Sequence, residues 1–146
     1  MLEFAHQEHI KSYYFDSRNQ TFELQPLTQQ EEADVCVIGA GFFGLSAALE
    51  LAEKGKKVIV LEGARVGFGA SGRSGGQAIN GFEEGIDEYI AQMGFDKAKK
   101  LWDMSLEAID IIDERIAKYG IQCDWKKGYA TLALNERRMD DLIEME

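Results

Sequence analysis

Cysteine is scarce in this sequence, as are the features that mark secreted and membrane proteins. Its 146 residues include two cysteines, Cys36 and Cys123, which are too few for a disulfide framework and lack the spacing of a zinc site. No apolar run approaches the length of a membrane span, and the first residues lack the basic and hydrophobic regions of a secretion signal. These absences predict a cytoplasmic protein with no metal site and no membrane span.

Basic residues are also in the minority. The chain has 16 lysines and arginines against 26 aspartates and glutamates, a net charge of −10, which disfavours a nucleic acid as partner. Hydrophobic residues make up 45% of the sequence, so a buried core is expected rather than disorder of the whole chain. Residues 35–80 differ in charge, with five bases and three acids, a net of +2, and they hold 10 of the 15 glycines. A basic, Gly-rich segment favours the binding of a small polyanion.

The order of patterns along the chain predicts four parts. A polar N-terminal arm covers residues 1–33, and a βαβ unit with a Gly-rich loop covers 34–81. A helical segment follows at 82–120, and a segment with one strand and one helix at 121–146. In the last part, alternation predicts a strand at 129–134, and Asn135 predicts the N-cap of a helix. Because that helix lacks an ending signal and one βαβ unit has too few strands for a doubly wound sheet, we expect a truncated chain, the front of something longer.

Two helices are expected within the helical segment. A short one covers residues 83–92, and a longer one begins with Asp96 as its N-cap and ends at Gly120. The apolar face of the longer helix includes Ser105. Its acids, within residues 103–114, are interpreted as a solvated face rather than as paired catalytic carboxylates.

The segment before the Gly-rich loop alternates between strand and helix patterns. Val35–Ile38 and Val58–Leu61 are continuous apolar runs that predict strands buried in the sheet, the first on both faces, with Cys36 as a small buried hydrophobe. Between them, residues 44–54 have helical spacing, and Gly55 provides a stop. A strand, a helix and a second strand in this order predict an α/β fold with a Rossmann-like βαβ unit.

A glycine fingerprint joins the first strand to the helix. In the GAGFFG sequence of residues 39–44, Gly39 permits a tight turn, Gly41 lets a pyrophosphate approach the backbone, and Gly44 lets the helix pack close to the strand. Glu62, at the end of the second strand, can accept hydrogen bonds from both hydroxyls of a ribose and would repel a 2′-phosphate, which disfavours NADP. The spacing predicts a dinucleotide site.

The fingerprint alone does not separate NAD from FAD, but the loop that follows the second strand does. Glycine recurs throughout residues 64–77, which suits backbone that lies against a large planar ligand and its phosphates. Gly and Ser alone would also fit a flexible, solvated loop. A fragment of an NAD-dependent dehydrogenase therefore stays open as an alternative.

These two stretches, DVCVIGAGFFGLSAALELAEKGKKVIVLE and RVGFGASGRSGGQ, resemble the FAD-dependent D-amino-acid-oxidase-type oxidoreductases, and within them the γ-glutamylputrescine oxidase subgroup. The resemblance implies that the ADP half of FAD is held by Gly39, Ala40, Gly41, Phe43, Gly44 and Glu62. It also places Ala70 and Ser71 beside the pyrophosphate, brings Ser74, Gly75, Gly76 and Gln77 toward the isoalloxazine, and lets Arg73 counter phosphate charge. Two positions depart from the subgroup: Ser74 stands where Asn is usual, and Phe43 replaces a small residue.

The resemblance also implies an activity for the whole enzyme. A C–N bond of a small amine or amino acid would be oxidised to an imine, and O₂ or another acceptor would reoxidise the flavin. No catalytic residue is assigned, because in this family the substrate-facing groups lie mostly in the later part, and residues 121–146 would only begin the substrate domain. The alternative is a non-catalytic FAD-binding module. The chain alone is expected to be inactive and to self-associate through exposed apolar surface.

Other residues with reactive or ligand-binding side chains receive plain structural interpretations. His6 and His9 are one helical turn apart without a third metal ligand, so both are predicted to be exposed. Trp102 and Trp125 are predicted to serve in packing. The N-terminal arm that carries the histidines is expected to lie on the surface of the domain with at most one short helical turn.

Overall fold

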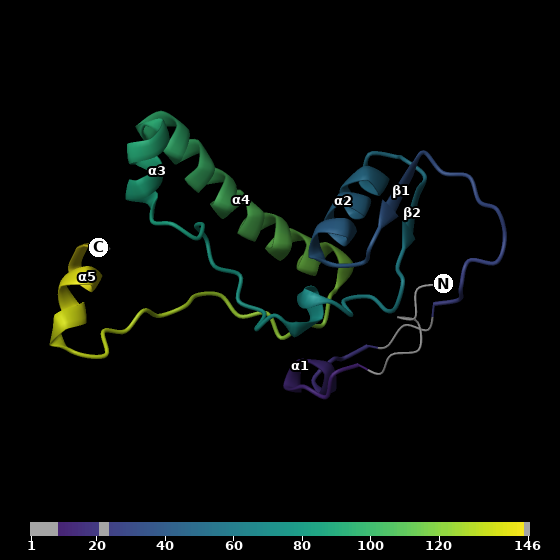
Figure 1. Cartoon of the computed structure of the whole chain (residues 1–146), viewed down its shortest axis with the longest axis horizontal. Helices are drawn as coiled ribbons and strands as arrows, with labels where there is room; N and C mark the ends of the chain where they lie inside the picture. The colour runs from purple at the N-terminus through teal and green to yellow at the C-terminus, as the bar shows by residue number, and fades with distance from the viewer. Residues whose placement is uncertain (1–8, 21–23, 145–146) are drawn as a thin grey trace. The chain divides into compact units, whose positions relative to one another are not determined.

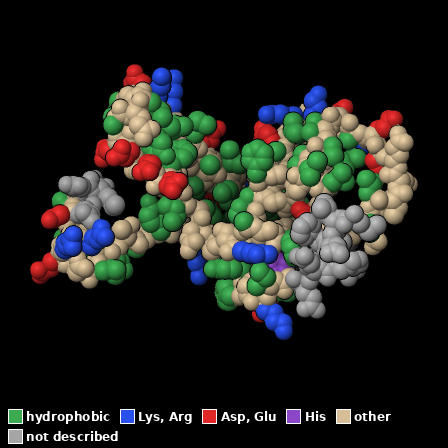
Figure 2. All heavy atoms as spheres, in the orientation of Figure 1, with side chains coloured by type: hydrophobic (Ala, Val, Ile, Leu, Met, Phe, Trp, Pro, Cys, Tyr) green, Lys and Arg blue, Asp and Glu red, His purple; other side chains and the backbone are tan. Residues whose placement is uncertain are grey.

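The computed structural model describes residues 9–20 and 24–144 of the chain (Figure 1). These residues form two compact units, one that ends at Gln77 and one that begins at Ala78. The first unit contains a small parallel sheet with one long helix, and the second consists of helices joined by irregular segments. Hydrophobic side chains reach the surface of both units (Figure 2).

The predicted βαβ unit is present in the first unit. Strand β1 (Val35–Ile38), helix α2 (Phe42–Glu53) and strand β2 (Val58–Leu61) follow one another, and the two strands pair in parallel with Val35 opposite Val58. Helix α2 begins two residues earlier than predicted, because the chain turns directly at Gly41, which is its N-cap. The α/β class and both strands predicted from the sequence are confirmed.

The expected burial of the first strand on both faces is wrong. Along β1, Val35 and Val37 are half-buried, whereas Cys36 is exposed and Ile38 is 87% exposed. Side chains of a strand alternate between the two faces of the sheet, and α2 packs against both strands from one side. The residues on the face that α2 covers are therefore sheltered, while Cys36 lies on the opposite face and is not a buried hydrophobe.

The N-terminal arm forms the single helical turn that its sequence allows. Helix α1 (Tyr13–Asp16) is capped by Ser12, whose Oγ accepts a hydrogen bond from the backbone N–H of Phe15 at 3.2 Å. The exposure predicted for His9 is wrong, because its half-buried ring stacks on Phe15 with centroids 4.3 Å apart and meets the edge of Phe68 at 5.7 Å. His6 lies outside the described residues.

The second unit is built around two helices that pack together, α3 (Ile86–Met93) and α4 (Phe95–Tyr119). They are separated by Gly94 alone, whose positive φ of 84° gives the chain the sharp turn between them. Helix α4 thus starts one residue before Asp96, which lies in its first turn instead of acting as the cap. Its predicted end is confirmed, since Gly120 adopts the left-handed conformation at φ 60°. None of the described helices is long and apolar enough to cross a membrane.

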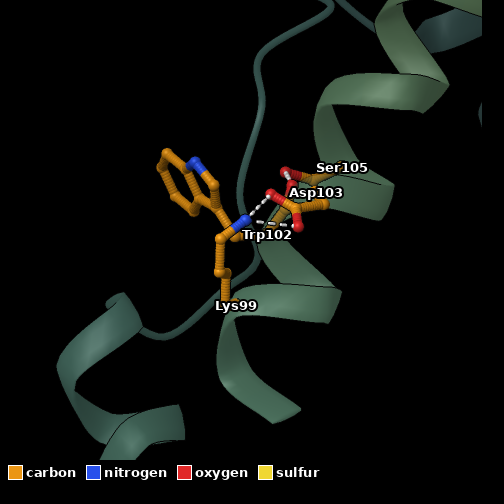
Figure 3. A network of polar contacts seen from close by, with 4 residues as sticks. All are labelled: Lys99, Trp102, Asp103 and Ser105. Carbon is orange, nitrogen blue, oxygen red and sulfur yellow. Dashed lines mark hydrogen bonds and ion pairs between the residues drawn. The ribbon is translucent and has the colours of Figure 1, made fainter. Parts of the chain in front are cut away.

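A buried serine ties the loop before α3 to α4. The Oγ of Ser105 donates to the carbonyl of Trp102 at 2.7 Å and accepts from the backbone N–H of Gly81 at 3.0 Å. Figure 3 shows this serine beside the ion pair of Lys99 and Asp103, which is exposed and joins successive turns of α4 at 2.6 Å. Because Ser105 is buried, its hydroxyl needs hydrogen-bond partners, and the bond with Gly81 attaches the loop to α4.

The strand predicted at residues 129–134 is wrong. Those residues have no strand conformation, and Leu132 and Leu134 are 79% and 91% exposed. An isolated extended segment gains no ladder hydrogen bonds, so alternation alone does not make it a strand. The cap predicted at Asn135 is confirmed, because its Oδ1 accepts from the N–H of Arg138 at 3.2 Å, where a 3₁₀ turn leads into α5 (Met139–Glu144).

Two side chains from the segment after α4 bind back to that helix. Trp125 Nε1 donates to one oxygen of Asp113 at 2.9 Å, and Lys127 Nζ pairs with the other at 2.5 Å. The hydrogen bond from Lys127, with its charge and the indole donor beside it, lowers the pKa of Asp113 below the ordinary aspartate value. A lowered folded-state pKa contributes stability above the unfolded pKa, and that contribution is lost as the pH falls through the folded pKa.

We predict that acid releases this contact in a single titration. As the pH falls below about 4, protonation of Asp113 should shift the indole N–H resonance of Trp125 in a two-dimensional NMR spectrum. The variant Asp113→Asn should lose the titration, whereas Asp103→Asn, which removes the ion pair with Lys99, should keep it. A Trp125 signal that titrates unchanged in Asp113→Asn would contradict the assignment.

We predict that Gly44→Ala destabilises the first unit. A Cβ at this position would lie 2.1 Å from the carbonyl oxygen of Gly39 and 3.3 Å from a methyl of Val37. The resulting strain, about 1–3 kcal/mol, should outweigh the roughly 1 kcal/mol that alanine gains in helix propensity. The measurement is urea unfolding, with Gly63→Ala as control because a Cβ there meets nothing within 4 Å. Equal stability of the two variants would refute the close approach.

Candidate dinucleotide-binding site

A hollow of about 380 Å³ lies in the first unit, where the carboxyl ends of both strands meet the start of α2. Three stretches of chain line it: the turn after β1, the residues that follow β2, and the Gly-rich loop. The lining residues are Ala40, Gly41, Glu62, Gly63, Ala64, Gly67, Phe68, Gly69, Ala70 and Ser71. The sequence fingerprint and the loop are thus brought to one place.

The turn after β1 is closed by backbone contacts. Gly39, with φ of 100°, donates its N–H to the carbonyl of Leu61 at 2.7 Å, which ties the turn to the end of β2. The carbonyl of Gly39 then lies so close to α2 that only a glycine fits at position 44. The packing role predicted for Gly44 is confirmed.

The first amides of α2 open toward the loop. The first hydrogen bond within the helix runs from Leu45 N–H to Gly41 C=O, so helix geometry leaves the amides before Leu45 without an intrahelical acceptor. The amide of Phe42 donates instead to Ser71 Oγ at 2.9 Å. A Cβ on Gly41 would lie 2.9 Å from the same oxygen. A side chain at residue 41 would therefore compete with the Ser71 hydroxyl for the space beside the helix start.

Glu62 connects the turn to the residues after β2. One carboxylate oxygen accepts the N–H of Ala40 at 2.7 Å, and the other accepts the N–H of Ala64 at 2.9 Å. The carboxylate is half-buried and lines the hollow. Each oxygen of a carboxylate has more than one lone pair, so both retain capacity to accept a further hydrogen bond.

The Gly-rich loop is folded rather than extended. Gly67 N–H donates to the carbonyl of Ala40 at 2.9 Å, which holds the loop against the turn after β1. The loop then crosses itself so closely that a Cβ on Gly72 would lie 2.1 Å from the carbonyl oxygen of Gly67. Gly72 belongs to a 3₁₀ turn, η2 (Ala70–Arg73), which also carries Ser71 to the helix start. These contacts distinguish the loop from a flexible linker.

Several residues singled out in the sequence lie outside the lining of the hollow. Phe43 is 89% exposed, so its ring does not crowd the start of α2. The Arg73 guanidinium lies over the Phe68 ring, 5.8 Å from its centroid, instead of facing the helix. Ser74, Gly75, Gly76 and Gln77 are exposed and follow η2. Their approach to an isoalloxazine stays a prediction.

The hollow also contains residues that sequence reasoning did not select. Gly63, Ala64 and Phe68 line it beside the predicted set. Gly67 and Gly72 were marked only by the recurrence of glycine, and the crossing at these two residues explains that recurrence. No sequence signal distinguishes Phe68 from the other aromatic residues, because its position follows from the arm that packs against it.

Comparison with known proteins gives an independent view of the chain. Residues 34–146 match the DAO family, described as FAD dependent oxidoreductase. The whole chain is 88% identical to the probable oxidoreductase OrdL of Haemophilus influenzae and covers 34% of that protein. It is 44% identical over 139 residues to gamma-glutamylputrescine oxidoreductase of Escherichia coli, which is 95% of this chain and 33% of the relative. No solved structure matches the chain.

The segment that matches the family includes the residues that form the hollow. The chain spans about a third of the length of these two relatives. The family match starts at residue 34, directly before β1, and so includes the turn, Glu62 and the Gly-rich loop that form the hollow. The family predicted from the two sequence stretches is confirmed: the chain belongs to the FAD dependent oxidoreductases.

Proposed function

We propose that this chain binds the ADP half of FAD in the hollow and forms the FAD-binding part of an oxidoreductase that acts on a C–N bond of a small amine. The observation that carries the proposal is the convergence on one hollow of a helix start whose first amides lack intrahelical acceptors, a carboxylate and a glycine loop. The name of the Escherichia coli relative supports an amine as the substrate class.

The helix start fits a pyrophosphate. The N-terminus of α2 carries partial positive charge and amides that the helix does not use. Ser71 Oγ, 2.9 Å from the amide of Phe42, demonstrates that an oxygen atom fits at this place. Gly41 offers bare backbone beside it, and residues 35–80 carry a net charge of +2, from five bases and three acids. An anionic oxygen would gain a charge-assisted hydrogen bond in place of the neutral one.

Glu62 fits a ribose with free hydroxyls. Its carboxylate faces the hollow and keeps lone pairs beyond those that accept the amides of Ala40 and Ala64. Those two amides also hold the carboxylate in one orientation, which lowers the cost of ordering it when a ligand binds. A 2′-phosphate would bring two like charges together, so NADP is disfavoured.

When bound, FAD would supply the capacity to take up a hydride from the C–H bond of the carbon attached to the amine nitrogen. The residues of this chain bind and orient the cofactor: α2 and Ser71 at its phosphates, Glu62 at its ribose. We assign them no role in proton transfer, because Glu62 is the acidic or basic residue among those that line the hollow, and it is proposed to bind the ribose. The substrate and the electron acceptor of the whole oxidoreductase are likewise part of the proposal.

Titration with flavin tests the cofactor directly. The chain should bind FAD with quenching of flavin fluorescence and a shifted visible absorption band, and FAD should bind more tightly than NADH measured in parallel. A colourless chain that binds NADH and not FAD would overturn the proposal in favour of a nicotinamide cofactor.

We predict that Gly41→Val abolishes FAD binding. The valine Cβ would lie 2.9 Å from Ser71 Oγ, so the side chain would displace that hydroxyl and occupy the space where the proposed pyrophosphate meets the backbone. Ser46→Val, which adds the same side chain at an exposed position of α2, is the matched control and should bind FAD as the unaltered chain does. Flavin retained by Gly41→Val in an equilibrium titration would show that the turn is not the phosphate site.

We predict that Glu62→Gln weakens FAD binding by about 1–3 kcal/mol, the range for a charge-assisted hydrogen bond. ADP, measured by displacement of FAD, should lose affinity by the same factor because the ribose that Glu62 contacts belongs to the ADP half. The control is Glu32→Gln, which removes an exposed acid from the same unit. An unchanged dissociation constant in Glu62→Gln would mean that the carboxylate serves only the amides of the turn.

A further inference from the structure

We propose that the N-terminal arm positions the Gly-rich loop for the cofactor through an aromatic stack, formed by His9, Phe15 and Phe68. The effect on FAD rests on the function proposed above, whereas the effect on the loop itself does not. The arm precedes residue 34, where the family match begins, so this role is not part of the matched family segment. The stack assigns His9 and Phe15 as positioning residues.

The three rings form a continuous ladder. The His9 ring lies parallel to Phe15, with centroids 4.3 Å apart and planes inclined by 16°. The His9 ring also meets Phe68 in an edge-to-face arrangement, with centroids 5.7 Å apart and planes inclined by 83°. Both are favourable arrangements of aromatic rings. His9, Phe15 and Phe68 are all half-buried, which sets them apart from the exposed Tyr13 on the same helical turn.

A guanidinium closes each end of the ladder. Arg18 lies over the outer face of the stack, with Cζ 3.6 Å from the centroid of Phe15, and its Nη1 donates to the Phe15 carbonyl. At the other end Arg73 lies 5.8 Å from the centroid of Phe68. Cations placed over ring faces in this way are attracted by the ring quadrupole. The arm and the loop thus each contribute one cation and at least one ring to a single assembly.

The ladder ends on a residue that lines the hollow. Phe68 stands between Gly67, which is bonded to Ala40, and Ser71, which is bonded to Phe42. These two polar contacts fix the loop to the turn and to α2 at its two ends. The stack supplies a third attachment at Phe68, between these two contacts in the sequence. Helix α1 also packs against η2.

Three attachments leave the loop little freedom before a ligand arrives. A glycine-rich loop loses more conformational entropy than other loops when it is ordered. If the arm already orders residues 67–71, the cofactor does not meet that cost on binding, and its affinity is higher. Removing the stack should therefore loosen the loop in the free chain and lower FAD affinity, without displacing any group that contacts the ligand.

Hydrogen exchange and FAD titration of the 146-residue chain test the proposal together. The variants Phe15→Ala and His9→Ala should increase amide exchange in residues 67–72 of the free chain. They should also raise the FAD dissociation constant by about three- to tenfold, the range set by one aromatic pair. His9→Phe, which keeps a ring between Phe15 and Phe68, should restore both properties.

The control is Tyr13→Ala, which removes a 79% exposed ring from the same turn of α1 and should change neither property. Unaltered exchange of residues 67–72 in both Phe15→Ala and His9→Ala would overturn the proposal, as would failure of His9→Phe to restore it. If exchange responds as expected but neither the unaltered chain nor any variant binds FAD, the arm positions the loop and the proposed cofactor is wrong. The two claims are therefore decided by separate readouts.

Discussion

The first unit depends on one close approach, between α2 and the turn that follows β1. The carbonyl of Gly39 occupies the space that any side chain at position 44 would need. This contact draws the helix start to the carboxyl end of the sheet, where Glu62 and the loop meet it. Without it, the amide of Phe42 would not lie within reach of Ser71, and the hollow would lose one of its walls.

The local parts of the fold could be predicted from the sequence because their causes are local. The apolar run of β1 pairs with a second apolar run only about twenty residues further along the chain, and Gly39 and Gly44 act on their immediate neighbours. The caps at Gly120 and Asn135 were predictable for the same reason, since each acts on backbone groups within a few residues.

The predictions that were wrong concerned features that depend on residues far away in the sequence. The exposure of Ile38 follows from which elements cover the sheet, and apolar composition does not encode that. The segment at 129–134 alternates like a strand, but a strand also needs a neighbour to bond with. In the candidate site, Phe68 was missed and His9 was misjudged because each becomes informative only beside the other. Motif reasoning found the glycines and Glu62, and could not find contacts between an arm and a loop.

The hydroxyl of Ser71 gives the site a further property. Since it already accepts the first amide of α2, this oxygen acts as a placeholder for an anion in the ligand-free chain. An anion that binds at this amide must displace the hydrogen bond from Phe42 to Ser71, and the loss of that bond offsets part of what the charge-assisted bond gains. A dinucleotide bound as proposed would also contact Glu62 and the loop, so the loss of this one hydrogen bond would be a small part of its binding free energy. For an anion as small as inorganic phosphate, which would contact the helix start alone, the same loss would be a larger part.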